Sequence, residues 1–185
     1  MQKKVARGLG TINFLKKVFD TKTLIMLYST LILPHISYCA EIWGNTYNSR
    51  YKQLTILQKR AIRIFGKVGY SEHTNELFAK FRCLKFEDIV KLKTCVFIHK
   101  VENRMIHESL LHRYTKNEDV HSYNTRNKNK FCKKKIKKNW MGFCMSVRGV
   151  ETYNNIPGLF KNVKKSIKFK KKLKSYILNG YRAVV

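Results

Sequence analysis

Basic side chains gather on one face of a helix that the sequence predicts over residues 50–66. On a helical wheel with 100° per residue, five of them fall within an arc of roughly 100°: Lys52, Lys59, Arg60, Arg63 and Lys67. No acidic residue lies between Arg50 and Lys67, so salt bridges between residues four apart do not explain this stripe. A solvated helix face is the ordinary explanation of a charged stripe. The missing acids instead favour contact with phosphate groups, and Gln53 and Gln58 lie nearby to hydrogen-bond phosphates or sugars.

A second basic set occupies the last third of the chain. Residues 121–185 hold 18 basic residues and one acid, Glu151, a net charge of +17. Residues 1–120 hold 21 basic and 10 acidic residues, a net charge of +11. The candidate phosphate-binding side chains of this second set are Arg126, Lys128, Lys130, Lys133, Lys134, Lys135, Lys137 and Lys138, then the lysines from 161 to 174, among them Lys170, Lys171 and Lys174.

Aromatic residues interleave with this second set and admit two interpretations. They are Tyr123, Phe131, Trp140, Phe143 and Tyr153. Such rings stack on the bases of single-stranded nucleic acids, but most of them are expected to form the core of a C-terminal lobe. The lysines over residues 133–138 also match the pattern of a nuclear-import tract.

Residues for catalysis are missing from the sequence. The three aspartates, Asp20, Asp88 and Asp119, are expected in different elements, whereas two-metal chemistry needs carboxylates close together. The sequence contains neither a phosphate-binding GxxxxGK[ST] loop nor a zinc-binding HExxH motif. Cys95 and His99 stand four residues apart, but two ligands do not make a zinc site, so we expect a buried cysteine beside a partly exposed histidine. The chain is therefore expected to be no enzyme and to need no cofactor or metal.

The net charge indicates a polyanionic partner. The chain has 39 Lys+Arg against 11 Asp+Glu, a formal charge of +28, and nucleic acid is the commonest ligand for such a protein. Residues 23–40 carry no charged side chain, but Pro34 and His35 within them favour a buried helix pair over a membrane span. Five cysteines without a CxxC pair favour a reducing location, in the nucleus or cytoplasm, and no membrane partner is expected.

Helical periodicity and capping residues predict a mainly α fold. Asp20 is placed to cap one helix, and Pro34 to open the next. The predicted helices cover residues 3–18, 21–33, 34–43, 50–66, a short stretch after Thr74, 86–101, 108–114 and 166–178. Residues 121–158 are expected to form loops and a small hairpin, with strands near 131–136 and 143–153. The predicted domains are a thumb-like helical bundle over 1–70, a helical connector over 71–120 and a basic region over 121–185, whose last helix turns Phe169, Leu173, Tyr176 and Ile177 inward.

Several blocks of the sequence, in order, resemble the region that follows the palm in reverse transcriptases of jockey- or CR1-like non-LTR retrotransposons. They are residues 27–39 (LYSTLILPHISYC), 42–44 (IWG), 57–64 (LQKRAIRI), 84–89 (LKFEDI), 123–126 (YNTR), 153–157 (YNNIP) and 169–174 (FKKKLK). The sequence departs from that family's pattern at Lys137, Lys138 and Asn139, and at Tyr153, where the family usually has tryptophan.

The resemblance implies a fragment made of the thumb and the basic region beyond it. In that family the thumb grips the template–primer duplex, while fingers and palm supply catalysis, so the implied partners are RNA, DNA or an RNA–DNA hybrid, and a palm or fingers domain. The alternative is a non-functional or co-opted remnant of a transposon, acting as a protein-interaction module or general nucleic-acid-binding module. That alternative predicts uncovered apolar surface on the helices over residues 3–44.

Overall fold

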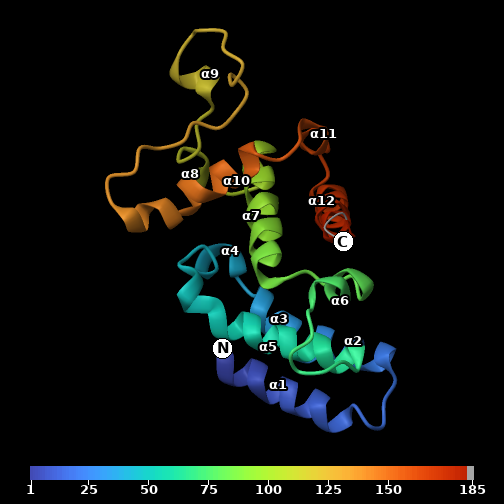
Figure 1. Ribbon diagram of the computed structural model, residues 1–185. Helices are drawn as coiled ribbons and strands as arrows, with labels where there is room; N and C mark the ends of the chain where they lie inside the picture. Colours follow the sequence, from blue (N-terminus) through green and yellow to red (C-terminus); the bar gives the residue numbers. More distant parts are fainter. Residues whose placement is uncertain (183–185) are drawn as a thin grey trace. The chain divides into compact units, whose positions relative to one another are not determined.

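The protein is mainly α-helical, as the sequence predicts. The computed structural model describes residues 1–182, of which most are helical, and no strand occurs in this part of the chain (Figure 1). The chain folds as two compact units. The first comprises residues 1–40, 46–90 and 175–182, and the second comprises residues 41–45 and 91–174. The division into three domains over 1–70, 71–120 and 121–185 stays a prediction.

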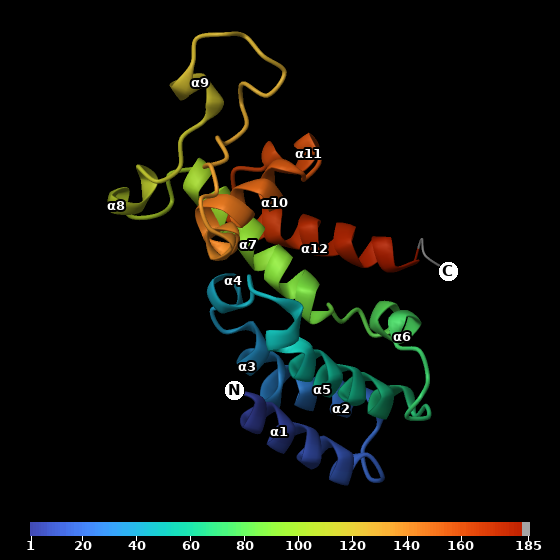
Figure 2. The same ribbon diagram turned by 60° about the vertical axis from the view of Figure 1, so that its left-hand side comes forward.

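The first unit is built on three packed helices, α1 (Gln2–Leu15), α2 (Thr21–Leu31) and α5 (Asn48–Gly66), which lie side by side in Figures 1 and 2. The other helices of this part are α3 (Leu33–Ser37), the start of α4 (Ala40–Trp43), α6 (Asn75–Lys80) and the first turn of α7 (Phe86–Glu102). The predicted cap is confirmed, because the Asp20 carboxylate accepts a hydrogen bond from the Thr23 N–H at 3.1 Å. Pro34 lies in the first turn of α3, as expected.

Close packing of α1 on the α2–α3 segment depends on Gly8. A β-carbon at this position would lie 3.2 Å from both the Leu31 carbonyl oxygen and Ile32 Cγ1. Val5 and Ile12 flank Gly8 on the same helix face and are fully buried. The face that α1 turns to the core is thus set by residues spaced three and four apart.

The polar centre of the first unit is Gln58, which is 1% exposed. Its amide nitrogen donates to the Tyr28 hydroxyl and to the Leu84 carbonyl oxygen, each at 2.9 Å. Its amide oxygen accepts from the Phe86 N–H, also at 2.9 Å, at the start of α7. Burial raises the pKa of the Tyr28 hydroxyl above its ordinary value. The expectation that Gln58 would hydrogen-bond phosphates is therefore wrong, because all of its polar atoms are used inside the core.

Helix α5 ends in a Schellman motif with Lys67 in the left-handed conformation, at φ 53° and ψ 36°. The Val68 N–H donates to the Arg63 carbonyl and the Lys67 N–H donates to the Ile64 carbonyl, both at 3.3 Å. The chain then folds back towards α5, so that Tyr70 returns to the side of Arg60.

The second unit is organised around α7 and holds most of α12 (Ser166–Arg182). Its remaining elements are α8 (Glu108–Leu111), α9 (Asn117–Val120), η1 (Asn139–Phe143), η2 (Met145–Gly149), α10 (Val150–Asn154) and α11 (Gly158–Lys161). The predicted hairpin is wrong: over residues 1–182 the only β-type pairing is an isolated bridge between Lys116 and Phe131. Val147, Val150 and Tyr153 are all buried, and their spacing of three belongs to a helical face rather than an alternating strand.

His99 is a core residue of the second unit, and the expectation that it is partly exposed is wrong. Its side chain is fully buried, its Nε2 lies 2.6 Å from the Val163 carbonyl oxygen, and its ring stacks on Phe169 with centroids 4.1 Å apart. Cys95, one turn earlier, is buried as predicted. Phe169, Leu173 and Ile177 are also buried as predicted.

Tyr176 departs from the predicted inward set of α12. It is 50% exposed, so the expectation that it turns inward is wrong. Phe169, Leu173 and Ile177 recur every four residues and define the buried stripe of the helix, whereas Tyr176 lies at its edge.

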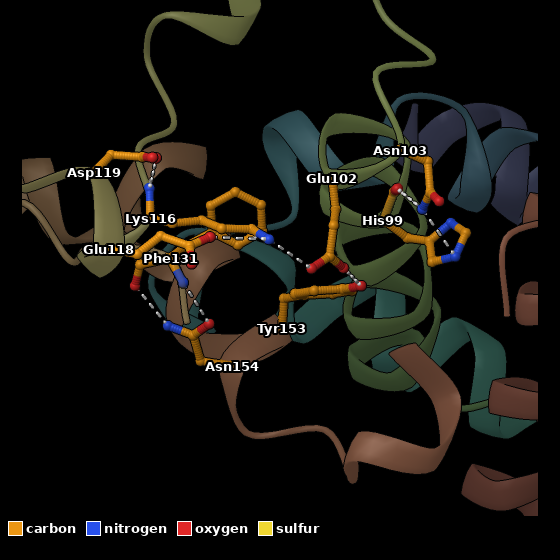
Figure 3. Close-up of polar contacts among 9 residues, drawn as sticks. All are labelled: His99, Glu102, Asn103, Lys116, Glu118, Asp119, Phe131, Tyr153 and Asn154. Atoms are coloured by element: carbon orange, nitrogen blue, oxygen red, sulfur yellow. Dashed lines mark hydrogen bonds and ion pairs between the residues drawn. The ribbon is translucent and has the colours of Figure 1, made fainter. Parts of the chain in front are cut away.

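A polar network ties α7 to the segments that follow it in the second unit (Figure 3). The Tyr153 hydroxyl donates to Glu102, whose other carboxylate oxygen lies 3.9 Å from Lys116 Nζ. The side chain of Asn154 bonds both backbone groups of Phe131, accepting from its N–H at 3.2 Å and donating to its carbonyl at 2.9 Å. These contacts hold the chain at Lys116 and at Phe131, before and within a long irregular segment, residues 121–138, which otherwise has few buried side chains.

Candidate nucleic-acid interface

A groove of about 1120 Å³ runs between α1 and α5 in the first unit. Two small residues of α1, Ala6 and Gly10, line it and leave it open, because a β-carbon added to Gly10 would meet no atom within 4 Å. Leu9, Leu57 and Ile64 line it with half-buried aliphatic side chains. The groove therefore offers apolar surface between two helices that pack closely elsewhere along their length.

The charged groups that line the groove are all basic. They are Lys16, Lys17, Arg60, Arg63 and Lys67, and no acidic side chain is among the lining residues. The one acid in residues 1–40 is Asp20. Hydrogen bonds from Thr23 hold the pKa of its carboxyl below the ordinary value, so it stays ionised as the cap of α2. With no acid in the lining to pair with these cations, the groove has an excess of positive charge.

Tyr70 holds the two arginines of the groove together. Arg60 Nη2 donates to the Tyr70 hydroxyl at 2.8 Å, and the guanidinium carbons of Arg60 and Arg63 lie 5.3 and 5.8 Å from the centre of the tyrosine ring. Arg63 Nε also donates to the Glu72 carbonyl oxygen at 2.9 Å. These contacts orient two guanidinium groups that would otherwise lose rotamer freedom when a ligand binds. Tyr70 itself remains 70% exposed.

The structure brings together only part of the predicted basic face. Arg60, Arg63 and Lys67 line the groove, whereas Lys52 and Lys59 are exposed on α5 outside it. Two lysines at the end of α1 and Tyr70 complete the lining and were missed from sequence. The signal available for Lys16 and Lys17 was the run of residues 1–19 without an acid. Nothing in the sequence places that run beside α5.

The second basic set belongs to the second unit and does not line this groove. Lys161 of this set is half-buried and donates to the Asn154 carbonyl oxygen at 3.3 Å. The other members are exposed, among them Arg126, Lys133, Lys134, Lys135, Lys137, Lys138, Lys170, Lys171 and Lys174. Lys133 Nζ contacts the Glu151 carboxylate at 2.7 Å. The assignment of the remainder of this set as phosphate contacts stays a prediction.

The interleaved aromatics divide between the two interpretations. Phe131 and Tyr153 are buried and pack edge to face with centroids 6.1 Å apart, which confirms that they are core residues. Tyr123 and Trp140 are exposed, and Phe143 is half-buried beneath Arg148. Base stacking is thus open only to the exposed rings of this region.

The remaining candidate sites give no metal centre or membrane segment. Within residues 1–182 no three His, Cys, Asp or Glu side chains gather as metal ligands. Asp88 accepts a hydrogen bond from the Tyr181 hydroxyl, which in turn accepts from the Lys85 N–H at 3.1 Å. None of the described helices combines the length and the apolar character that crossing a bilayer requires.

Comparison with protein-family models, with curated proteins and with solved structures gives no match for this chain.

Proposed function

We propose that the protein binds nucleic acid, without base-sequence specificity, through the groove between α1 and α5. The observation that carries this proposal is the lining, which contains five basic side chains and no acid. Two of the five are arginines, whose planar guanidinium groups match phosphate oxygens in a two-pronged geometry. We further propose that the chain is a thumb-like, non-catalytic fragment of a jockey-like retrotransposon reverse transcriptase, on the strength of the sequence blocks that resemble that family.

The number of cations in the groove sets the expected salt dependence. Each phosphate contact contributes about 0.7 to 0.9 to the slope of log affinity against log salt concentration. Five contacts give a slope of about −3.5 to −4.5, so affinity should fall roughly 130- to 500-fold between about 50 and 200 mM salt. A slope near zero, or no binding to RNA, DNA or a hybrid, would contradict the proposal.

Two triple variants separate the groove from net charge. Changing Arg60, Arg63 and Lys67 to alanine should lower the slope by about 2 to 3, because three phosphate contacts are lost. The matched control changes three basic residues of the same helix that do not line the groove, Arg50, Lys52 and Lys59, and should alter the slope by less than about 1. Equal effects of the two variants would mean that binding follows overall charge rather than this site.

A second candidate function is docking on a protein domain, and exposed apolar residues of α1 and the turn after it favour it. Phe14 is 81% exposed and Val18 is 78% exposed, and Met26 of α2 is also largely exposed. A palm or fingers domain would cover such a surface if the chain is a fragment. Aggregation of the wild-type chain on expression, relieved by adding a palm domain or by Phe14→Ser with Val18→Ser, would support this function. A wild-type chain that stays dispersed and does not bind an added palm domain would count against it.

Of the two expected locations of the protein, nucleus and cytoplasm, residues 133–138 support the nucleus. All five lysines of this stretch are exposed, on a backbone that forms neither helix nor strand. Short, exposed basic stretches of this kind are read by nuclear-import receptors, although many such matches have no function. We propose a nuclear location on this basis.

Primer extension by the pure protein would contradict the non-catalytic assignment.

A further inference from the structure

We infer that the groove between α1 and α5 takes single-stranded nucleic acid and that an unpaired base stacks on the cluster formed by Tyr70, Arg60 and Arg63. The inference rests on the proposed function and specifies its ligand. It differs from a grip on duplex alone, because a duplex presents phosphates and sugars to a protein groove and keeps the faces of its bases stacked inside the helix.

The lining of the groove mixes charged and apolar groups. Contact with a duplex backbone requires only cations and hydrogen-bond donors. The groove also contains half-buried aliphatic side chains from both helices, among them Leu9, Leu57 and Ile64. Apolar surface among cations suits a single strand, because its phosphates can contact the lysines while its bases pack on the apolar side chains and are removed from water.

Tyr70 is exposed and is held in place by its neighbours. A tyrosine that exposes 70% of its surface is usually mobile, yet here Arg60 holds its hydroxyl at 2.8 Å and two guanidinium groups lie near its ring. The ring is therefore both accessible and fixed. Fixing it before binding lowers the entropy lost when a base stacks on it. Arginine planes offer a second stacking surface for the same base.

The volume of the groove also suits a single strand. Sites that enclose drug-sized ligands measure about 300–1,000 Å³. The groove, at about 1120 Å³, is of a size to take a few nucleotides of one strand.

The test compares two probes with the same phosphates, using the full chain. One is a short fluorescent oligothymidine, and the other is the same oligonucleotide with abasic sugars in place of every thymidine. Stacking of a base on an aromatic ring corresponds to roughly 5- to 150-fold in affinity. The wild-type chain should therefore bind oligothymidine at least about fivefold more tightly than the abasic probe.

Variants assign the effect to Tyr70. Tyr70→Ala should lose most of the preference for oligothymidine over the abasic probe, with its melting temperature unchanged. Its affinity for the abasic probe should fall as well, because the ring no longer orients Arg60 and Arg63, so the ratio of the two affinities is the readout. Tyr70→Phe keeps the ring and should retain most of the preference. Tyr38, which is as exposed as Tyr70 but lies outside the groove, provides the control, and Tyr38→Ala should change neither affinity.

Three results would contradict different parts of the proposal: base stacking, its assignment to Tyr70, and nucleic-acid binding itself. Equal affinity for the two probes would overturn base stacking while leaving phosphate binding by the groove intact. A preference for thymidine that survives in Tyr70→Ala would overturn the assignment to this cluster. Failure of the wild-type chain to bind either probe, and to bind duplex, would overturn the proposed function itself and the inference with it.

Discussion

Replacing Gln58 with leucine should remove the polar centre of the first unit without changing its volume greatly. The amide of Gln58 makes three hydrogen bonds of 2.9 Å, to the Tyr28 hydroxyl, the Leu84 carbonyl and the Phe86 N–H. Leucine can replace none of them, so two backbone groups and a buried hydroxyl would be left without these partners. Water has little access to them, because Tyr28 and Phe86 are each 1% exposed.

The expected cost follows from these three contacts. A buried polar group that loses its partner costs about 1–3 kcal/mol. Three groups give about 3–6 kcal/mol once some relaxation and the better burial of leucine are allowed for. A domain has only about 5–15 kcal/mol of stability in total, so the variant should be close to unfolding at 37 °C.

Urea denaturation followed by circular dichroism measures this cost. The matched control is Gln53→Leu, the same exchange at an exposed position of the same helix, which should change the free energy of unfolding by less than about 0.5 kcal/mol. If the two variants unfold at the same urea concentration, the three hydrogen bonds contribute nothing and the description of Gln58 as the centre of the core is refuted.

Three further predictions follow from other contacts. Gly8→Ala should destabilise the protein by about 1–3 kcal/mol, because its β-carbon would press on the Leu31 carbonyl oxygen. Gly10→Ala should instead stabilise α1 by about 0.5–1 kcal/mol, because its β-carbon meets open space. Thermal melts of the two variants check both signs. Burial raises the pKa of the Cys95 thiol to about 12 from an ordinary 9.0, so the unfolded chain loses this proton first and stability should fall as pH rises from 9 towards 12, less steeply in Cys95→Ala when unfolding is measured across that range. A large fluorescent fusion of the chain should accumulate in nuclei and should cease to do so when the lysines of residues 133–138 become serine; unchanged import would remove that function from the stretch.

Helix positions and buried stripes could be predicted from the sequence, because they depend on spacing along one helix. Asp20 and the apolar residues of the helix over 50–66 gave elements within about two residues of those observed. Pro34 correctly marked the start of a helix, but the single helix predicted over 34–43 is wrong, because α3 ends at Ser37 and α4 begins at Ala40. The hairpin failed for a reason visible in the spacing, since Val147 and Val150 are three residues apart and a strand would need an even separation.

Gln58 and His99 show a different kind of error, in which residue type was given more weight than position. Gln58 lies four residues after Leu54 and four before Ile62, both buried, and therefore belongs to the buried face of α5. His99 lies four residues after the buried Cys95, with the same consequence. Both positions were predictable from periodicity, but the partners of their polar atoms were not.

Only the part of the groove that α5 contributes could be predicted from the sequence. Arg60 and Arg63 share a helix, so their common face follows from the sequence. Lys16 and Tyr70 join them only because α1 docks on α5 and because the chain reverses after α5. Contacts between distant segments depend on tertiary packing, which no local pattern in this sequence encodes.

Lys67 has two roles: it ends α5 in the left-handed conformation, and its side chain lines the groove. Glycine is the residue that this conformation favours, and a side chain with a β-carbon there costs about 1 kcal/mol. Exchanging Lys67 for glycine should therefore raise the melting temperature while weakening the hold on a polyanion, since one ammonium group leaves the lining. At this position one substitution therefore raises stability and lowers affinity for a polyanion, so the two properties cannot be improved together.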